Sequence, residues 1–223
     1  MKNFLFLLLL LNYSFAAGYQ NLVSGYIFEN SSVTHPKIDH VAHVKNYAIN
    51  LQYTKMHPLY YAKASIVIHP NQYMSKGYSE GYRYTSRFSM KKVELNWGAK
   101  YLFSKTLYFV PSIGVNYLLS SQNFSTSDKF INEGKERDAA SFPLDIFIGY
   151  QYGRKSDLII GINVEDDVTN LRNSDDNDYS ITWQHSFNRN PLMRLEYRKT
   201  TSFPTNEIKI VHERFLVGAG FNF

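Results

Sequence analysis

The chain has 223 residues, a formal net charge of +5, 18 Tyr and 16 Phe, and it contains no Cys. The absence of Cys excludes a disulfide framework and a thiolate metal site. Basic pairs such as Lys91-Lys92 and Arg154-Lys155 are scattered along the chain, so the charge excess does not indicate a nucleic-acid-binding protein.

The N-terminus has the three parts of a secretory signal peptide. Lys2 precedes an apolar run at residues 4–11, and the small residues Ser14 and Ala16 follow. We therefore expect cleavage after Ala16, with a signal peptide at 1–16 and one β-barrel domain at 17–223. No later run of 18 apolar residues predicts a membrane-spanning helix.

The rest of the chain alternates between apolar and polar residues, which is the period of a β-strand. The first alternating segment, 19–28, is the weakest, and the last, 215–223, reaches the final residue. The ten predicted strands lie at 19–28, 46–54, 60–69, 93–101, 107–117, 142–152, 158–165, 179–184, 193–198 and 215–223.

Short and long connections alternate between these segments along the chain. Short turns are expected at 54–59, 103–107, 152–157 and 187–191. Long polar loops are expected at 29–43, 70–87, 120–139, 166–178 and 202–208. This alternation is typical of a transmembrane antiparallel up-and-down β-barrel with short periplasmic turns, and an even strand number leaves both ends inside the cell envelope. Ten strands satisfy that parity, and eight is the next choice.

Aromatic residues lie at the ends of the predicted strands, as in the girdles of membrane barrels. Those beside short turns or the C-terminus are Tyr53, Tyr60, Tyr101, Tyr150, Tyr152, Phe187 and Phe223. Those beside long loops are Tyr47, Tyr117, Phe142 and Tyr179. A soluble barrel or sandwich with its apolar face inward has the same alternation. The Gly, Asn and Ser content of the polar face and the position of the aromatics favour the membrane barrel.

The C-terminal sequence "FLVGAGFNF" resembles the signature of bacterial outer-membrane β-barrel proteins. The residues that carry the resemblance are Phe215, Val217, Ala219, Phe221 and Phe223. It implies an outer-membrane location, contact with outer-membrane lipid and lipopolysaccharide, and recognition of the last strand by the barrel-assembly machinery. It implies no cofactor and does not identify an external partner.

The polar face places a set of charged residues toward the lumen. The predicted lumen-lining residues are Lys63, Glu94, Lys100, Asp145, Glu165, Arg194, Glu196, Arg198 and Arg214, with His212 beside them. Because buried charges need partners or water, two interpretations stay open. The charges form an internal network that holds the barrel shut, or they line a narrow polar channel for small solutes.

Short motifs raise the alternative of a surface enzyme. Asp39-His40 and Asp166-Asp167 resemble the residue pairs of omptin proteases, which activate water. His185-Ser186 resembles the base and nucleophile of lipid A deacylases, but neighbours on a strand point to opposite faces. The motifs are too short to outweigh loop polarity, so we expect no enzymatic activity and no catalytic residues.

Two loops contain residue types that bind metals. His35, His40 and His43 match no standard zinc spacing, and the acidic stretch 165–178 lacks the Gly and final Glu of a calcium loop. We expect no metal site. The sequence predicts a barrel with a structural or surface-contact role, and passage of small solutes is kept open as an additional role.

Overall fold

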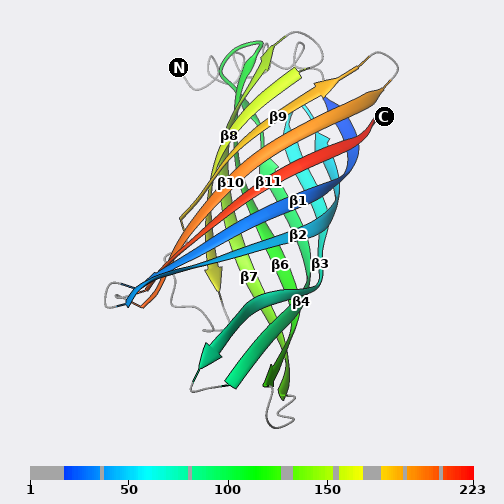
Figure 1. The fold of residues 1–223 in the computed structure, drawn as a ribbon. Helices are drawn as coiled ribbons and strands as arrows, with labels where there is room; N and C mark the ends of the chain where they lie inside the picture. Colours follow the sequence, from blue (N-terminus) through cyan, green and yellow to red (C-terminus); the bar gives the residue numbers. More distant parts are fainter. Residues whose placement is uncertain are drawn as a thin grey trace.

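The computed structural model describes residues 18–35, 38–79, 82–126, 133–152, 156–167, 177–187, 190–205 and 208–223. These residues form one antiparallel sheet that closes on itself as a barrel (Figure 1). The predicted signal peptide at 1–16 lies outside the described residues. Among the described residues, no helix is long and apolar enough to cross a membrane.

The wall contains ten strands in up-and-down order, as predicted. The two-residue strand β5 continues the line of β4 after Lys100, and both pair with β6. The strands are β1 (Tyr19–His35), β2 (Ile38–Met56), β3 (Tyr60–Ser79), β4 (Tyr82–Ala99), β5 (Tyr101–Leu102), β6 (Leu107–Thr126), β7 (Glu133–Tyr152), β8 (Ser156–Asp167), β9 (Asn177–Ser186), β10 (Pro191–Thr205) and β11 (Ile208–Asn222).

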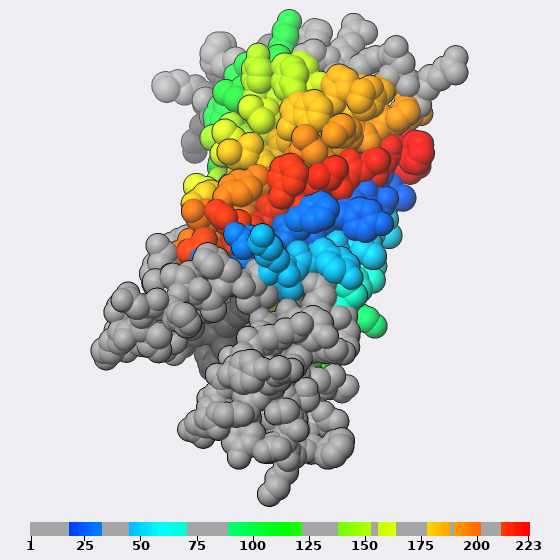
Figure 2. Space-filling model, in the orientation of Figure 1, coloured from blue at the N-terminus to red at the C-terminus, as the bar shows by residue number. Residues whose placement is uncertain are grey.

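The first and last strands close the ring. They pair in one continuous register from Asn21↔Asn222 to Thr34↔Lys209. The backbone N–H of Phe223 also donates to the carbonyl of Gln20, 2.9 Å away. Figure 2 shows β10, β11, β1 and β2 side by side as slanted bands of one continuous surface. The closed wall leaves no unpaired edge at this seam, which is the condition for a sheet in lipid.

The outer face of the wall is an apolar band. Within one strand Trp97 is 60% exposed, whereas the neighbouring Asn96 is 6% exposed. The predicted girdle residues Tyr101 and Tyr150 are exposed near the short turns, and Tyr47 near the other edge. Apolar side chains that a soluble protein would bury therefore face outward and polar ones inward. The assignment of the two faces made from the sequence is confirmed.

The strands are longer than the alternation predicted. Much of the sequence assigned to the loops at 29–43, 70–87, 120–139 and 202–208 is strand, so the loop prediction was wrong over those stretches. The β3–β4 pair, for example, stays in register as far as Ser79↔Tyr82. Beyond the membrane both faces of a ribbon meet water, so pairing continues without the apolar alternation that marks a strand within the membrane.

In the described part of the chain, these extensions form two separate sheets at the outer end of the barrel. Among the described residues, β2 and β3 pair no further outward than Ile49↔Ile68, and β7 and β8 no further than Ser141↔Asp167. One outer sheet therefore contains β2, β1, β11 and β10, and the other contains β3, β4, β6 and β7. In Figure 1 the β1–β2 ribbon ends at the left, while β3 and β4 end at the bottom.

Candidate functional site

A layer of apolar side chains crosses the lumen near the end that carries the short turns. It consists of Met56, Tyr61, Tyr108, Val110 and Phe147, all at most 8% exposed. The rings of Tyr61 and Phe147 meet edge to face with their centroids 4.9 Å apart. These side chains come from β2, β3, β6 and β7, so they reach across the lumen and form a small core inside it.

Tyr108 is positioned in this layer by its close approach to Gly149 and by its contact with Lys100. A Cβ on Gly149 would lie within 2.3 Å of three atoms of the Tyr108 phenol, so the ring occupies the space that a side chain at 149 would need. The ammonium of Lys100 lies 4.5 Å from the Tyr108 ring centroid, within the range of a cation–π contact. We refer to this set of side chains as the apolar layer.

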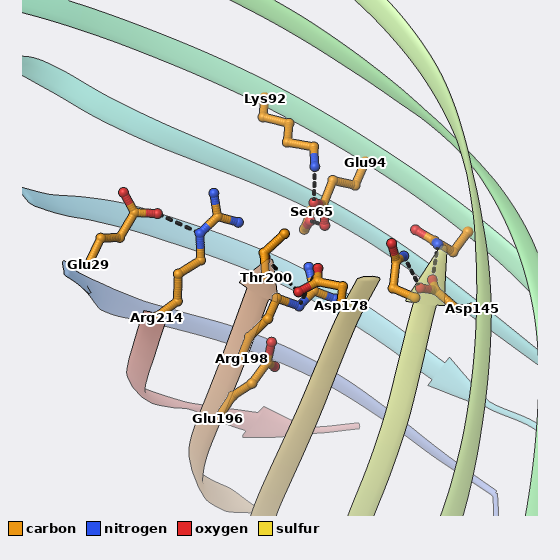
Figure 3. Close-up of polar contacts among 12 residues, drawn as sticks. Glu29, Ser65, Lys92, Glu94, Asp145, Asp178, Glu196, Arg198, Thr200 and Arg214 are labelled. Carbon is orange, nitrogen blue, oxygen red and sulfur yellow. Dashed lines mark hydrogen bonds and ion pairs between the residues drawn. The ribbon is translucent and has the colours of Figure 1, made fainter. Parts of the chain in front are cut away.

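A set of ion pairs, which we call the charged layer, lies farther from the short turns than the apolar layer; several of its members are drawn in Figure 3. One group is centred on Glu94 of β4. Its Oε2 lies 2.9 Å from Lys63 Nζ and its Oε1 lies 3.1 Å from Lys92 Nζ. The hydroxyl of Ser65 donates a third contact at 2.8 Å. A carboxylate with two ammonium partners and a hydroxyl donor is fully compensated despite its burial.

A second group of pairs comes from β9 and β10. Arg194 Nη2 and Glu196 Oε2 are 2.6 Å apart, two residues along the same face of β10. Asp178 on β9 lies 3.6 Å from Arg198 Nε and accepts a hydrogen bond of 2.6 Å from Thr200. Positions of equal parity along a strand share a face, which brings these side chains together in the lumen.

The outermost group joins β1, β3 and β11. Glu29 Oε1 lies 2.7 Å from Arg214 Nε, and Glu29 Oε2 lies 3.4 Å from His69 Nδ1. Nearby, the Ser31 hydroxyl and His212 Nδ1 are 2.7 Å apart. The Glu29–Arg214 and Ser31–His212 contacts follow from the β1–β11 register, which places the two members of each pair opposite each other.

Asp145 is held by amides instead of cations. Its two carboxylate oxygens accept hydrogen bonds from Asn96 and Asn163, which flank it on β4 and β8 (Figure 3). Closer to the short turns, Asp157 accepts a 3.1 Å hydrogen bond from Gln184. Amide donors therefore stabilise both of these carboxylates.

The charges of the inner wall balance. Among the described residues the basic side chains are Lys63, Lys92, Lys100, Arg194, Arg198 and Arg214. The acidic ones are Glu29, Glu94, Asp145, Asp157, Asp178 and Glu196. Two cavities of about 60 and 40 Å³ lie between them, and both are lined by Lys63, Glu196 and Arg198. Spaces of this size hold a few water molecules and no larger solute.

The structure places the residues proposed to line the lumen as follows. Lys63, Glu94, Arg194, Glu196 and Arg198 meet in the charged layer, and Arg214 lies in its outermost group. Lys100 lies beside the apolar layer and Asp145 between two amides. The side chain of Glu165 lies outside the described part of the chain. The five residues proposed as an assembly signal lie on the outer face of β11 and at its end: Phe215, Val217, Ala219, Phe221 and Phe223.

Sequence reasoning missed several inner residues. Glu29 and Asp178 were assigned to loops, although both continue the inward parity of their strands. Lys92 and Asp157 lie just outside the predicted strands. Extending the parity of each strand by a few residues would have found all four. The apolar layer was also missed, because its members occupy positions on the face that was assigned as polar.

Among the enzyme-like pairs from the sequence, His185-Ser186 lies in the described part of the chain. His185 and Ser186 have different partners: His185 Nδ1 lies 2.6 Å from the Ser156 hydroxyl, and Asn222 donates to Ser186. The side chains of Asp39, His40, Asp166 and Asp167 lie outside the described part of the chain. Within that part, no group of three His, Asp or Glu side chains is placed to hold a metal ion. His35, His40 and His43, and most of the acidic stretch 165–178, have no described side chains.

A closed ten-stranded wall with an apolar outer band, aromatic edges and a polar interior defines an outer-membrane β-barrel protein of bacterial type. Solved structures of that class share the fold. The β-domain of the Bordetella autotransporter BrkA aligns at a TM-score of 0.57 and 11% identity, covering 93% of this chain and all of that one (100%). The translocator domain of NalP from Neisseria meningitidis aligns at 0.56 and 11% identity, covering 91% and 88%. No protein-family model and no curated protein matches the sequence.

Proposed function

We propose that this outer-membrane barrel is closed to solutes, carries out no catalysis, and acts through contacts that its extended strands make outside the membrane. The observation that carries the proposal is the apolar layer. Met56, Tyr61, Tyr108, Val110 and Phe147 form a buried cluster inside the lumen, in which the side chains pack on one another. A continuous path for water and ions would have to pass between these buried groups.

The charged layer supports the same function. A conducting pore needs ions to enter sites that they can leave, whereas here each described carboxylate on the inner face of the wall already has a basic or amide partner. The cavities of about 60 and 40 Å³ are too small for a solute larger than water. These pairs serve as the internal network that holds the barrel shut, which was one of the two interpretations of the sequence.

The part of the chain beyond the membrane is well suited to contact. The stretch 71–90, which holds the outer parts of β3 and β4, contains three Lys or Arg and one Glu, together with four Tyr. Tyr and Arg are the residue types that most often dominate binding interfaces. The barrel then serves as an anchor, and the outer sheets present the binding surfaces.

Conductance of the refolded protein in a planar bilayer tests the proposal. We expect no discrete steps from the wild type or from Glu196→Gln, because the apolar layer remains. The double variant Tyr61→Ala/Phe147→Ala should open a path and produce steps. Leu95→Ala/Ile148→Ala, which removes side chains from the outer face, should stay silent. Charge-sensitive steps from the wild type that change with Glu196→Gln would overturn the proposal in favour of a channel.

A further inference from the structure

The larger of the two lumen cavities, of about 60 Å³, lies between the apolar layer and the charged layer. Its lining includes Met56, Tyr61 and Phe147 from the apolar layer and Arg194 and Glu196 from the charged layer. A polar group that faces a small space inside a protein needs a partner within that space, because leaving it unpaired costs free energy. The polar groups of the lining therefore indicate what the cavity can hold.

A position without a side chain contributes to this space. Gly161 of β8 lies between Phe147 of β7 and Ser180 of β9 in the register of the sheet. A Cβ at position 161 would lie 2.9 Å from the Ser180 hydroxyl oxygen and 3.4 Å from the Phe147 Cβ. The cavity thus borders a part of the wall where any side chain at 161 would reduce its volume.

The side chains around this cavity carry more positive than negative charge. Of the described residues, three basic ones line it, Lys63, Arg194 and Arg198, against two acidic ones, Asp145 and Glu196. Both carboxylates already accept hydrogen bonds, Asp145 from two asparagine amides and Glu196 from Arg194 Nη2, 2.6 Å away. The inner wall as a whole is balanced, but the lining of this cavity has one positive charge in excess.

Several donors of the lining have no hydrogen-bond partner among the described residues. The most buried is the Nε–H of Arg194, whose side chain is 10% exposed. The hydroxyls of Thr182 and Ser180 are also without a partner in that part of the chain, and they lie opposite Glu196 and Arg198 in the β9–β10 register. A hydroxyl can donate or accept, whereas an arginine Nε can only donate and requires an acceptor.

A small anion fits these features better than a cation or a neutral solute does. An excess of positive charge attracts an anion, and the two hydroxyls can turn to donate to it. The volume of the cavity suits a few water molecules, and a monatomic anion such as chloride is comparable in size to a water molecule. A large organic anion such as gluconate does not fit into this space.

We propose that the larger lumen cavity binds one chloride ion, which accepts hydrogen bonds from Arg194 Nε and from the hydroxyls of Thr182 and Ser180. The second cavity, of about 40 Å³, shares three lining residues with the first and includes Arg214 nearer the outer end of the barrel. The ion therefore enters from the outer end. It stays in the lumen as a bound component, so the inference does not depend on whether the barrel is closed.

Chloride-dependent stability tests the proposal on the full-length protein refolded in lipid vesicles. Urea unfolding is followed in sodium chloride and in sodium gluconate at the same ionic strength. A ligand that binds only the folded state raises the ratio of folded to unfolded protein with its concentration. We expect this ratio to rise roughly tenfold when chloride reaches about ten times its Kd, and bromide should act in the same way.

Two variants assign the effect to the cavity. Thr182→Val removes one hydroxyl from a nearly unchanged side-chain shape and should weaken chloride binding about fivefold. Arg194→Lys keeps the positive charge beside Glu196 but removes the Nε–H, and should weaken binding on the order of tenfold. The matched control is Thr201→Val, the same change on the outer face of β10, which should leave the chloride dependence as it is. A purely structural loss lowers the urea midpoint in both salts alike.

Crystals grown in bromide locate the ion. We expect an anomalous-scattering peak within hydrogen-bond distance of Arg194 Nε and Thr182 Oγ1. Water alone in the cavity of those crystals, equal urea midpoints in chloride and gluconate, or an unchanged chloride dependence in both variants would overturn the inference. Bilayer conductance measures passage through the lumen and not binding within it. A protein that conducts and is still stabilised by chloride would keep the anion site and lose the closed lumen.

Discussion

The apolar and charged layers of the lumen fill the same barrel by different physical means. The apolar layer gains stability from packing of Tyr61, Tyr108 and Phe147, and each member contributes by its volume. The charged layer gains specificity from partners such as Lys63 and Glu94, and each member depends on the charge it faces. The difference shows that a barrel with a lipid-facing exterior also contains a buried apolar core, which lies inside the lumen.

The largest expected effect is on stability, and it compares the removal of a ring from the lumen with the removal of a ring from the outer face. Phe147→Ala should lower the free energy of unfolding by about 4 kcal/mol, because the ring is buried and its loss leaves a cavity. Urea unfolding in lipid vesicles, followed by the fluorescence of Trp97 and Trp183, measures the change. The control Phe142→Ala removes a ring that is 52% exposed on the outer face and should cost about 1 kcal/mol. Equal losses would contradict the existence of a core in the lumen.

Removing a charge from the charged layer should cost nearly as much. Glu94→Gln leaves Lys63 and Lys92 without their carboxylate and should destabilise the barrel by about 3 kcal/mol. Glu213→Gln is the matched change at the half-exposed pair with Lys199, 3.8 Å apart, and should cost less than about 1 kcal/mol. If both substitutions had the same small effect in urea titrations, the charged layer would be hydrated, and its pairs would not be structural.

A smaller effect should come from crowding the apolar layer. Gly149→Ala places a methyl group against the buried Tyr108 phenol and should cost about 2 kcal/mol. Gly161→Ala is the control, because its nearest atom is the Ser180 hydroxyl, 2.9 Å away at the end of a short side chain that can turn. Comparing the two variants by the temperature at which the barrel loses its folded migration on a detergent gel tests the difference. A Gly149→Ala protein as stable as the wild type would mean that Tyr108 has free space.

Within the membrane the wall was predictable because lipid and lumen impose opposite preferences on successive residues. Leu95, Trp97 and their neighbours therefore reveal strand, face and approximate ends. The outer ribbons were assigned as loops because both of their faces meet water, so Tyr78 and Tyr82, near the end of the β3–β4 pairing, carry no apolar period.

The contents of the lumen were predictable only in part. Parity assigns Glu94 and Arg198 to the interior, but it does not say which strands face each other across the barrel. Tyr61 on β3 and Phe147 on β7 meet although β4 and β6 lie between their strands, so their contact depends on how the sheet closes into a ring.

The seam between β1 and β11 has a consequence for how the chain reaches this fold. Its partners are about as far apart in sequence as the chain allows, from Asn21 with Asn222 to Thr34 with Lys209. Pairing of β1 with β11 closes a loop of nearly the whole chain, and the loss of chain entropy on that closure opposes the step that completes the ring. High contact order makes such a step slow, so the nine other strand contacts can form while the ring is still open. Phe223, whose N–H pairs with Gln20, must therefore have been exported before any molecule can complete its barrel.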